Sequence, residues 1–198
     1  MRPFGNTFGP DVFPNGLMNK LSLSAIGEFY YRSTPKRGRG AIQNITAFYQ
    51  VLDLFGDWNR VYGSRGFLQY QFLVPFGAET ALRRLVQKIG ASRHASGLNV
   101  LKRFGAGNQA PLSFPQPGWT ITVDFPIEPG LHRFCDELDE LVLEAGGRLY
   151  LAKESRTTGA TFKRGYPRFE EWRKVRDAAD PDGVFVSDMA RRLELTGS

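Results

Sequence analysis

The chain has 198 residues, of which 41% are hydrophobic and 23% are charged, a composition typical of a globular domain. Such a length can bury one core, as a single domain or as a domain with an extension. The formal net charge of +6 would suit nucleic acid, but the basic residues are dispersed apart from one segment, so no nucleic-acid partner is expected. No run of about 18 apolar residues and no N-terminal signal pattern occurs, so we expect neither a membrane-spanning helix nor an export signal.

That one basic segment, KRGR at 36–39, leaves two interpretations open. It is either a solvated loop or a surface attracted to a phosphorylated lipid or an anionic membrane. We therefore expect a cytoplasmic location or a peripheral one at the cell envelope.

The sequence offers no support for metal, hydrolase or nucleotide-triphosphatase chemistry. The histidines, His94 and His132, lack H-E-x-x-H spacing, and the single cysteine, Cys135, has no partner for a disulfide or a multi-cysteine metal site. Cys135 lies in an apolar stretch and is expected to be a buried small hydrophobic residue. No G-x-S-x-G elbow and no P-loop ending is present, so no metal cofactor and neither of these enzyme classes is expected.

The first third of the chain is irregular. Short helical patterns at 11–23 and 44–54 alternate with loops rich in Gly, Pro and Asn. Trp58 and Tyr62 belong either to the rim of a site or to buried aromatic packing.

Residues 66–153 show a regular order of strand and helix patterns. A strand at 66–75 and an amphipathic helix at 78–92 are followed by strands at 96–104 and 119–125, a helix at 130–145 and a strand at 148–153. The order βαββαβ predicts an α+β, ferredoxin-like fold, in which both helices cover one face of an antiparallel sheet. An irregular or helical N-terminal extension and C-terminal helices are expected beside it.

The first and third strands are central neighbours in such a sheet. Period-two alternation then places Gln69 and Gln71 on the same face as Thr120, Thr122 and Asp124, away from the helices. A solvated face and a ligand-binding face are both consistent with this pattern. A ferredoxin-like module that binds RNA would instead expose aromatic residues among Arg and Lys on that face, and the amides and threonines argue against it.

The C-terminal stretch is predicted to be helical. A helix is expected from Pro167 and ends at Asp180-Pro181, and Ser187 has the character of an N-cap for a short last helix that carries Arg191 and Arg192. We expect this tail to dock against the rest of the fold.

Several separated blocks of the sequence, in one order, resemble a family of FAD-linked sugar oxidases. The blocks are DVFPNGL at 11–17, GFLQYQF at 66–72, NQAPLSFP at 108–115, GRLYLAKESRTT at 147–158 and the region 172–195, which contains SDMARRL. The family includes the D-arabinono-1,4-lactone oxidases, the decaprenylphosphoryl-β-D-ribose oxidases and more distant enzymes like vanillyl-alcohol oxidase.

The resemblance implies that this chain is the C-terminal, substrate-binding portion of such an enzyme. Residues 1–65 would form an irregular extension at the substrate entrance, and residues 66–198 the substrate domain with its helical tail. The family holds FAD mainly through a separate N-terminal domain, so we expect the chain to be part of a longer protein or one half of a split enzyme.

The activity implied is the oxidation of a secondary alcohol of a sugar to a ketone, with hydride transfer to the flavin. The branch with the greatest resemblance acts on the 2'-OH of a lipid-linked sugar phosphate, decaprenylphosphoryl-β-D-ribose, and an NAD(P)H-dependent keto-reductase subunit completes an epimerisation that serves arabinan synthesis in the cell wall. Two alternatives stay open: an aldonolactone oxidase, or a noncatalytic module that is inactive without a flavin-domain partner.

Position by position, the resemblance also implies a substrate-binding set on the first three strands: Gln69, Gln71, Leu98, Val100, Lys102, Thr120 and Thr122. The glutamines are expected to hydrogen-bond the substrate, and Lys102 to orient it or to handle a proton. Some members of the family have asparagine and cysteine where this chain has Thr120 and Thr122, so identical contacts are not implied there.

Lys153, with Tyr150 near it, matches a lysine that contacts the flavin in the family. A cation near N1 and the C2 carbonyl would stabilise the negative charge that develops as hydride arrives. Lys102 and Lys153 are therefore the expected catalytic residues, and Lys153 and Tyr150 the expected cofactor-binding residues.

Overall fold

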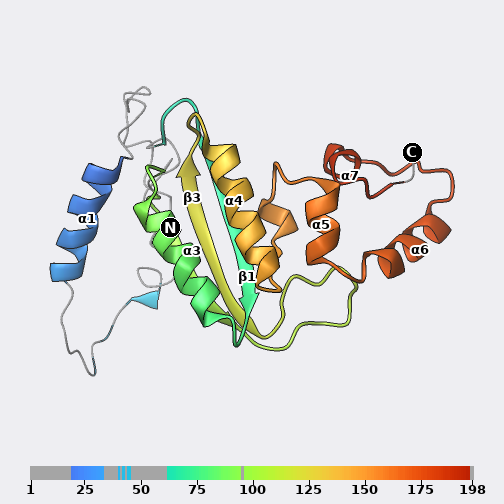
Figure 1. The fold of residues 1–198 in the computed structure, drawn as a ribbon, viewed down its shortest axis with the longest axis horizontal. Helices are drawn as coiled ribbons and strands as arrows, with labels where there is room; N and C mark the ends of the chain where they lie inside the picture. The colour runs from blue at the N-terminus through green and yellow to red at the C-terminus, as the bar shows by residue number, and fades with distance from the viewer. Residues whose placement is uncertain are drawn as a thin grey trace.

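A computed structural model describes residues 19–33, 40, 42, 44, 45, 62–94 and 96–196. Its centre is a 4-stranded antiparallel sheet in the order β2-β3-β1-β4. The strands are β1 (Phe67–Pro75), β2 (Asn99–Phe104), β3 (Gly118–Pro126) and β4 (Arg148–Leu149). Helices α3 (Glu79–Ala91) and α4 (Leu131–Glu144) lie across one face of this sheet (Figure 1). The predicted α+β, ferredoxin-like arrangement is confirmed.

The main core lies between the sheet and these two helices. Residues of β1 and β3 that point toward the helices alternate along each strand, as the register pairs Tyr70 with Val123 and Phe72 with Ile121. The buried members of this core are Leu68, Tyr70, Phe72, Val74, Leu85, Ile121, Val123, Phe125, Leu131, Cys135, Leu138, Val142 and Leu149. The apolar stripes predicted for both helices therefore supply the cover that the sheet needs.

The C-terminal elements form a second, smaller core at the α4 side of the sheet. They are the 3₁₀ turn η3 (Leu151–Lys153) and helices α5 (Gly159–Gly165), α6 (Phe169–Ala179) and α7 (Asp188–Arg192) (Figure 1). Its buried residues are Phe162, Tyr166, Phe169, Leu193 and Leu195. The expectation that the tail docks by packing is thus confirmed, although the short α5 was not predicted.

Helix boundaries agree with the capping signals in the sequence. Ser187 caps α7, because its Oγ accepts the backbone N–H of Ala190 at 3.1 Å, as predicted. Thr158 caps the unpredicted α5 in the same way, through Thr161 at 3.2 Å. Helix α6 ends immediately before Asp180, also as predicted.

Two strands are shorter than the sequence patterns indicate. The predicted strand at 96–104 starts only at Asn99. Just before it, the backbone N–H of Asp124 donates both to the Leu98 carbonyl and to the Ser96 hydroxyl, so regular pairing of the strand begins after these residues. The predicted strand at 148–153 ends at Leu149. Tyr150 makes one more backbone bond, to Gln71 O at 2.9 Å, and the chain then turns into η3.

In the N-terminal third, helix α1 (Lys20–Ser33) covers the last residues of the helix expected at 11–23 and runs further, while 11–18 lie outside the described residues. Most of the helix expected at 44–54, the basic segment 36–39 and Trp58 lie outside the described residues. Tyr62 is buried and stacks on Phe67 with ring centroids 4.6 Å apart, so of its two interpretations the structure favours aromatic packing. Among the described helices, none has both the length and the apolar composition that crossing a membrane requires.

Backbone-to-backbone packing at Gly147 provides a first test of the fold. A Cβ added there would lie 2.2 Å from Leu73 O and 2.8 Å from Val142 O, whereas one added at Gly90 in α3 would meet nothing within 4 Å. Gly147→Ala is therefore expected to lower the free energy of unfolding by about 2 kcal/mol or more. Gly90→Ala should instead raise it by about 0.5–1 kcal/mol. Urea unfolding measures both, and equal effects would contradict the packing.

The buried thiol provides a second test. Cys135 has no exposed surface, and burial raises the pKa of its thiol to about 11. Iodoacetamide at pH 8 should leave the native protein unlabelled over a period in which the guanidinium-unfolded chain is labelled completely. Rapid stoichiometric labelling of the native protein would show that this part of the core opens.

Candidate functional site

The face of the sheet opposite α3 and α4, here called the polar face, carries the predicted substrate-binding residues. The register pairs Gln71 with Thr122 and Gln69 with Asp124, and side chains of paired residues project to the same side. On the other edge of β3, Lys102 pairs with Thr120 and Val100 with Thr122. Leu98 joins them, because its carbonyl accepts the backbone N–H of Asp124. The structure thus brings the whole predicted set together.

The polar face is largely buried. Gln71 retains 7% of its exposed area, Thr120 1%, Thr122 4% and Asp124 none. The interpretation of this face as simply solvated is therefore wrong for β1 and β3. Gln69 is half-buried, and the β2 edge is more open, with Lys102 exposed and Val100 half-buried.

Aromatic residues supply part of the cover over the polar face. The loop 105–117 folds back so that Phe114, itself buried, packs against Tyr150 with ring centroids 4.6 Å apart. Phe114 also meets Phe104 edge-on at 5.8 Å. Arg148 stabilises this position of the loop, because its Nη1 donates a hydrogen bond to Ser113 O at 2.8 Å. The loop therefore packs beside the polar face, and the buried hydrogen bonds of that face are stronger than they would be in water.

Polar atoms on this face are paired in a defined order. Gln69 Nε2 donates to Asp124 Oδ1 at 2.7 Å, and Gln71 Nε2 donates to Thr120 Oγ1 at 3.1 Å. Thr120 Oγ1 in turn donates to Phe72 O at 2.7 Å. Asp124 Oδ2 is buried and has no hydrogen-bond partner among the described residues. A buried carboxylate oxygen without a partner among the described residues can accept a hydrogen bond from a ligand or from a water molecule.

Charges gather around Asp124. Burial raises the pKa of Asp124, while the bond from Gln69 and the charge of Lys153 oppose this shift. Burial lowers the pKa of the Lys153 ammonium, with Asp124 opposing this shift and Lys102 adding to it. The fold therefore places Lys153 within electrostatic reach of the buried Asp124 carboxylate and of Lys102. The sequence interpretation had treated Asp124 only as one polar residue of the face.

Lys153 is presented by a rigid turn that Glu154 holds. The Glu154 carboxylate, with 5% of its side chain exposed, accepts the backbone N–H groups of Arg156 and Thr157. Arg192 of α7 donates to the same carboxylate at 2.8 Å and to Thr157 O at 2.6 Å. The C-terminal helices thus fix the position of the lysine through its sequence neighbour.

Arg156 ties the same turn to the main core. Its guanidinium, 7% exposed, bonds Asp139 and Asp136 of α4, and the Tyr70 hydroxyl donates to the other oxygen of Asp139 at 2.8 Å. Burial lowers the pKa of Arg156, but the charge and hydrogen bond of Asp139 outweigh it and raise that pKa. An acidic residue in the apolar stripe of α4 was the signal in the sequence that could have revealed this buried ion pair.

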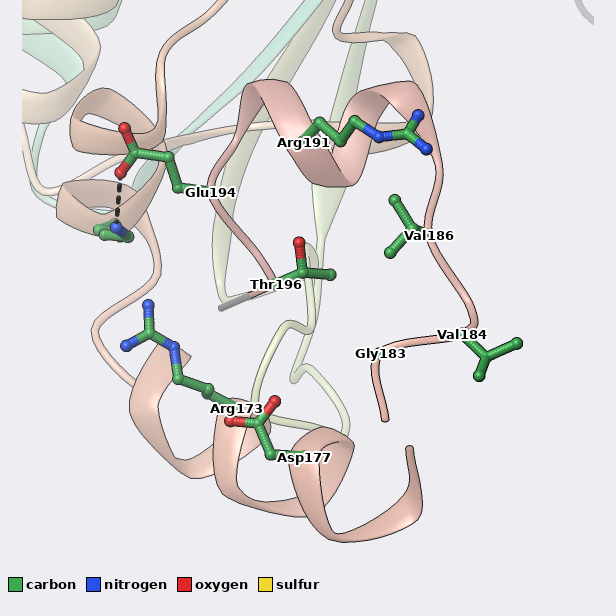
Figure 2. A pocket seen from close by; sticks show the side chains of 9 residues that line it. Arg173, Asp177, Gly183, Val184, Val186, Arg191, Glu194 and Thr196 are labelled. Atoms are coloured by element: carbon green, nitrogen blue, oxygen red, sulfur yellow. Dashed lines mark hydrogen bonds and ion pairs between the residues drawn. The ribbon is translucent and has the colours of Figure 1, made fainter. Parts of the chain in front are cut away.

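The residues of the turn line a common space with the glutamines. A small cavity of about 10 Å³ lies where Gln69, Gln71, Tyr150 and Lys153 converge. A much wider hollow, of about 990 Å³, lies among the C-terminal helices and is lined by Arg173, Asp177, Val184, Val186, Arg191 and neighbours (Figure 2). No predicted site residue contributes to that wider hollow.

The residues of the polar face fit the flavin that the family implies. Lys153 Nζ forms no hydrogen bond or ion pair with any described residue, so it is available to an electron-rich group. Tyr150 lies one hydrogen-bonded turn of chain before it, since Lys153 N donates to Tyr150 O at 3.1 Å. The described residues contain no group of three or more His, Cys, Asp or Glu side chains suited to a metal ion.

Comparison with known proteins points to the same chemistry. The sequence model for D-arabinono-1,4-lactone oxidase matches residues 71–193. The chain is 59% identical over 186 residues to the decaprenylphosphoryl-beta-D-ribose oxidase of Mycolicibacterium smegmatis, covering 94% of this chain and 40% of that protein. It is 36% identical over 187 residues to an uncharacterized protein in the mprA 5' region of Streptomyces coelicolor, covering 94% of this chain and 50% of that protein.

A more distant match, 36% identical over 130 residues, is the L-gulono-1,4-lactone dehydrogenase of Mycobacterium tuberculosis, with 64% of this chain and 30% of that protein covered. The chain therefore spans half or less of the length of these curated relatives.

The buried ion pair yields a test with an internal control. Arg156→Ala leaves the carboxylate of Asp139 buried without its cation and should lower the free energy of unfolding by about 3–5 kcal/mol. Arg164 pairs with Glu140 at 2.8 Å with both side chains about half exposed, so Arg164→Ala should cost less than about 1 kcal/mol. Urea unfolding compares the two variants. Similar losses would show that Arg156 does not anchor the turn.

Proposed function

Because the chain belongs to the D-arabinono-1,4-lactone oxidase family, we propose that it forms the substrate-binding portion of an FAD-dependent oxidoreductase that acts on CH–OH groups. The reaction proposed is the oxidation of a sugar secondary alcohol to a ketone. The observation that carries the proposal is the polar face itself. It has two oriented glutamines and a buried carboxylate, beside a lysine that forms no hydrogen bond or ion pair with the described residues.

The proposed substrate is decaprenylphosphoryl-β-D-ribose, oxidised at its 2'-OH. Support comes from 59% identity, over 94% of this chain, to an oxidase named for that compound. FAD, held mainly by residues outside this chain, would accept the hydride from the sugar carbon. Lys153 and Tyr150 are the residues here that would contact it.

The remaining residues have distinct proposed roles. Gln69 and Gln71 hydrogen-bond the sugar hydroxyls, and Leu98 and Val100 provide apolar lining. Lys153 places a fixed positive charge where negative charge develops in the transition state. The buried face excludes water, so that this charge is weakly screened.

Lys102, Thr120 and Thr122 have other proposed roles in substrate binding. Lys102 is exposed at the β2 edge, where an ammonium can orient the phosphate-linked substrate or exchange a proton with solvent. Thr120 is occupied by Gln71 and the Phe72 carbonyl, so it acts through the glutamine, and Thr122 adds a hydroxyl beside it.

The proposal extends to the surroundings of the reaction. The ketone product would pass to a separate NAD(P)H-dependent keto-reductase, which completes an epimerisation for arabinan synthesis. A lipid-linked substrate implies contact with a membrane surface, for which the basic segment 36–39 is suited. Residues 66–198 would be the substrate domain and residues 1–65 the extension at its entrance.

An aldonolactone is the second candidate substrate. It is favoured by the matching family and by the lactone dehydrogenase among the relatives. A lactone substrate lacks the phosphate and the polyprenyl chain, so the two candidates separate in one experiment. The third candidate, a module that is inactive without a flavin-domain partner, predicts that the joined protein is active and that the chain alone is not.

We would join this chain to the flavin-binding portion of the Mycolicibacterium smegmatis oxidase in place of the matching part and follow loss of the oxidised-flavin absorbance under anaerobic conditions. Decaprenylphosphoryl-β-D-ribose should bleach the flavin and L-gulono-1,4-lactone should not. Lys153→Met should slow bleaching by about 10²-fold or more, because it removes one preorganised charge. Gln71→Ala should mainly weaken substrate binding.

Lys174→Met is the matched control, because Lys174 is exposed on α6, away from the polar face. It should bleach at the parental rate. If Lys153→Met and Gln71→Ala also bleach at the parental rate, the reaction does not take place at the polar face. If only the lactone bleaches the flavin, the substrate is an aldonolactone and not the lipid-linked ribose.

A further inference from the structure

We propose that Asp124 and Thr120 are positioning residues that lock both glutamine amides in one orientation, so that the polar face offers hydrogen-bond acceptors to its ligand. The ligand class that follows, a compound that donates through adjacent hydroxyl groups, rests on the proposed function. The orientation of the amides does not, because it is a property of the chain alone.

The orientation of Gln69 follows from the chemistry of its partner. Its amide lies 2.7 Å from Asp124 Oδ1, and the two residues are paired across β1 and β3. An ionised carboxylate can only accept, so the Nε2 group must face it. The inverted amide would set two acceptor oxygens against each other in a buried place, at a cost in stability that no other described contact offsets.

The orientation of Gln71 follows from a proton count at Thr120. The Thr120 hydroxyl has one proton, which it donates to Phe72 O at 2.7 Å. Its oxygen can then only accept from Gln71, at 3.1 Å, and the Nε2 group must again be the one that faces it. Thr120 is 1% exposed, so water does not compete for this relay.

Both amide oxygens are consequently left for a ligand. Neither Oε1 atom is bonded to a described residue, and neither is among the buried atoms left without a partner, so both keep accessible surface. Residues i and i+2 of one strand lie about 7 Å apart on the same side. The face therefore presents two acceptors from neighbouring same-side positions of β1, with cationic donors at Lys102 on one side and Lys153 on the other.

The same arrangement implies specificity. A ligand whose hydroxyls are methylated or missing would leave oriented acceptors unpaired in a dry site, which is the arrangement that discriminates most strongly between analogues. Residues that never touch the ligand would thereby set which hydrogen-bonding pattern the site accepts.

Side-chain amide NMR of the ¹⁵N-labelled chain tests the orientation without flavin or substrate. If Gln69 Nε2 donates to Asp124, its resonances should move as Asp124 titrates, with a midpoint above that of an ordinary aspartate, because burial raises the pKa of Asp124. The titratable groups that also face Asp124 are the Lys153 ammonium and the neutral Tyr62 phenol, and both titrate at much higher pH than a carboxyl group. Asp124→Asn should abolish the movement.

Gln71 provides the matched pair of variants. Thr120→Val keeps the shape but removes the acceptor, so the Gln71 amide should lose its protection from hydrogen exchange, whereas Thr120→Ser should retain it. A wild-type Gln69 amide that is insensitive to pH, or a Gln71 amide that exchanges equally in both variants, would overturn the proposal. The titration of the wild-type chain tests the orientation of the Gln69 amide even if a variant fails to fold. Neither result depends on whether the proposed oxidation is correct.

Discussion

The pairing of β1 with β3 sets the geometry on which the rest of the structure depends. It runs from Phe67 opposite Pro126 to Pro75 opposite Gly118 without interruption. A slip of one residue would turn Tyr70 and Phe72 away from the helices and bring Gln69 and Gln71 into the apolar core. Burial of the apolar set and hydrogen bonding of the polar set therefore select the same register, and each stabilises the other.

The second constraint is the charged clamp around the turn that bears Lys153. Glu154 and Arg156 are both nearly buried, and they attach this turn to α7 and to α4 respectively. Lys153 itself is left without a partner among the described residues. Lys153 is thus fixed in place by neighbours whose own charges are paired. This arrangement is expected of a preorganised electrostatic site, in which the charged group moves little during the reaction.

Sequence patterns predicted the faces of the sheet because alternation and amphipathic stripes depend only on local period. They could not predict the end of β4, which follows from the bonds that Glu154 makes to the backbone after it. Nor could they show that Gln71, Thr120, Thr122 and Asp124 are buried, because burial depends on segments that are distant in sequence, such as the loop that brings Phe114 against Tyr150. Asp124 was placed on the correct face, but the burial of its unpaired oxygen and the proximity of Lys153 depend on tertiary structure, which the pattern does not contain. The roles of the site residues themselves rest on resemblance and stay predictions.

The central claim is that the polar face is the surface of this chain that meets flavin and sugar. A crystal structure of the chain assembled with the flavin-binding portion of a relative, loaded with FAD, tests it most directly. The account predicts that the flavin ring lies against this face, within contact distance of Lys153, with the glutamine Oε1 atoms turned toward the space beside it. A ring bound elsewhere, for instance in the hollow among the C-terminal helices (Figure 2), with Lys153 in solvent, would contradict the account.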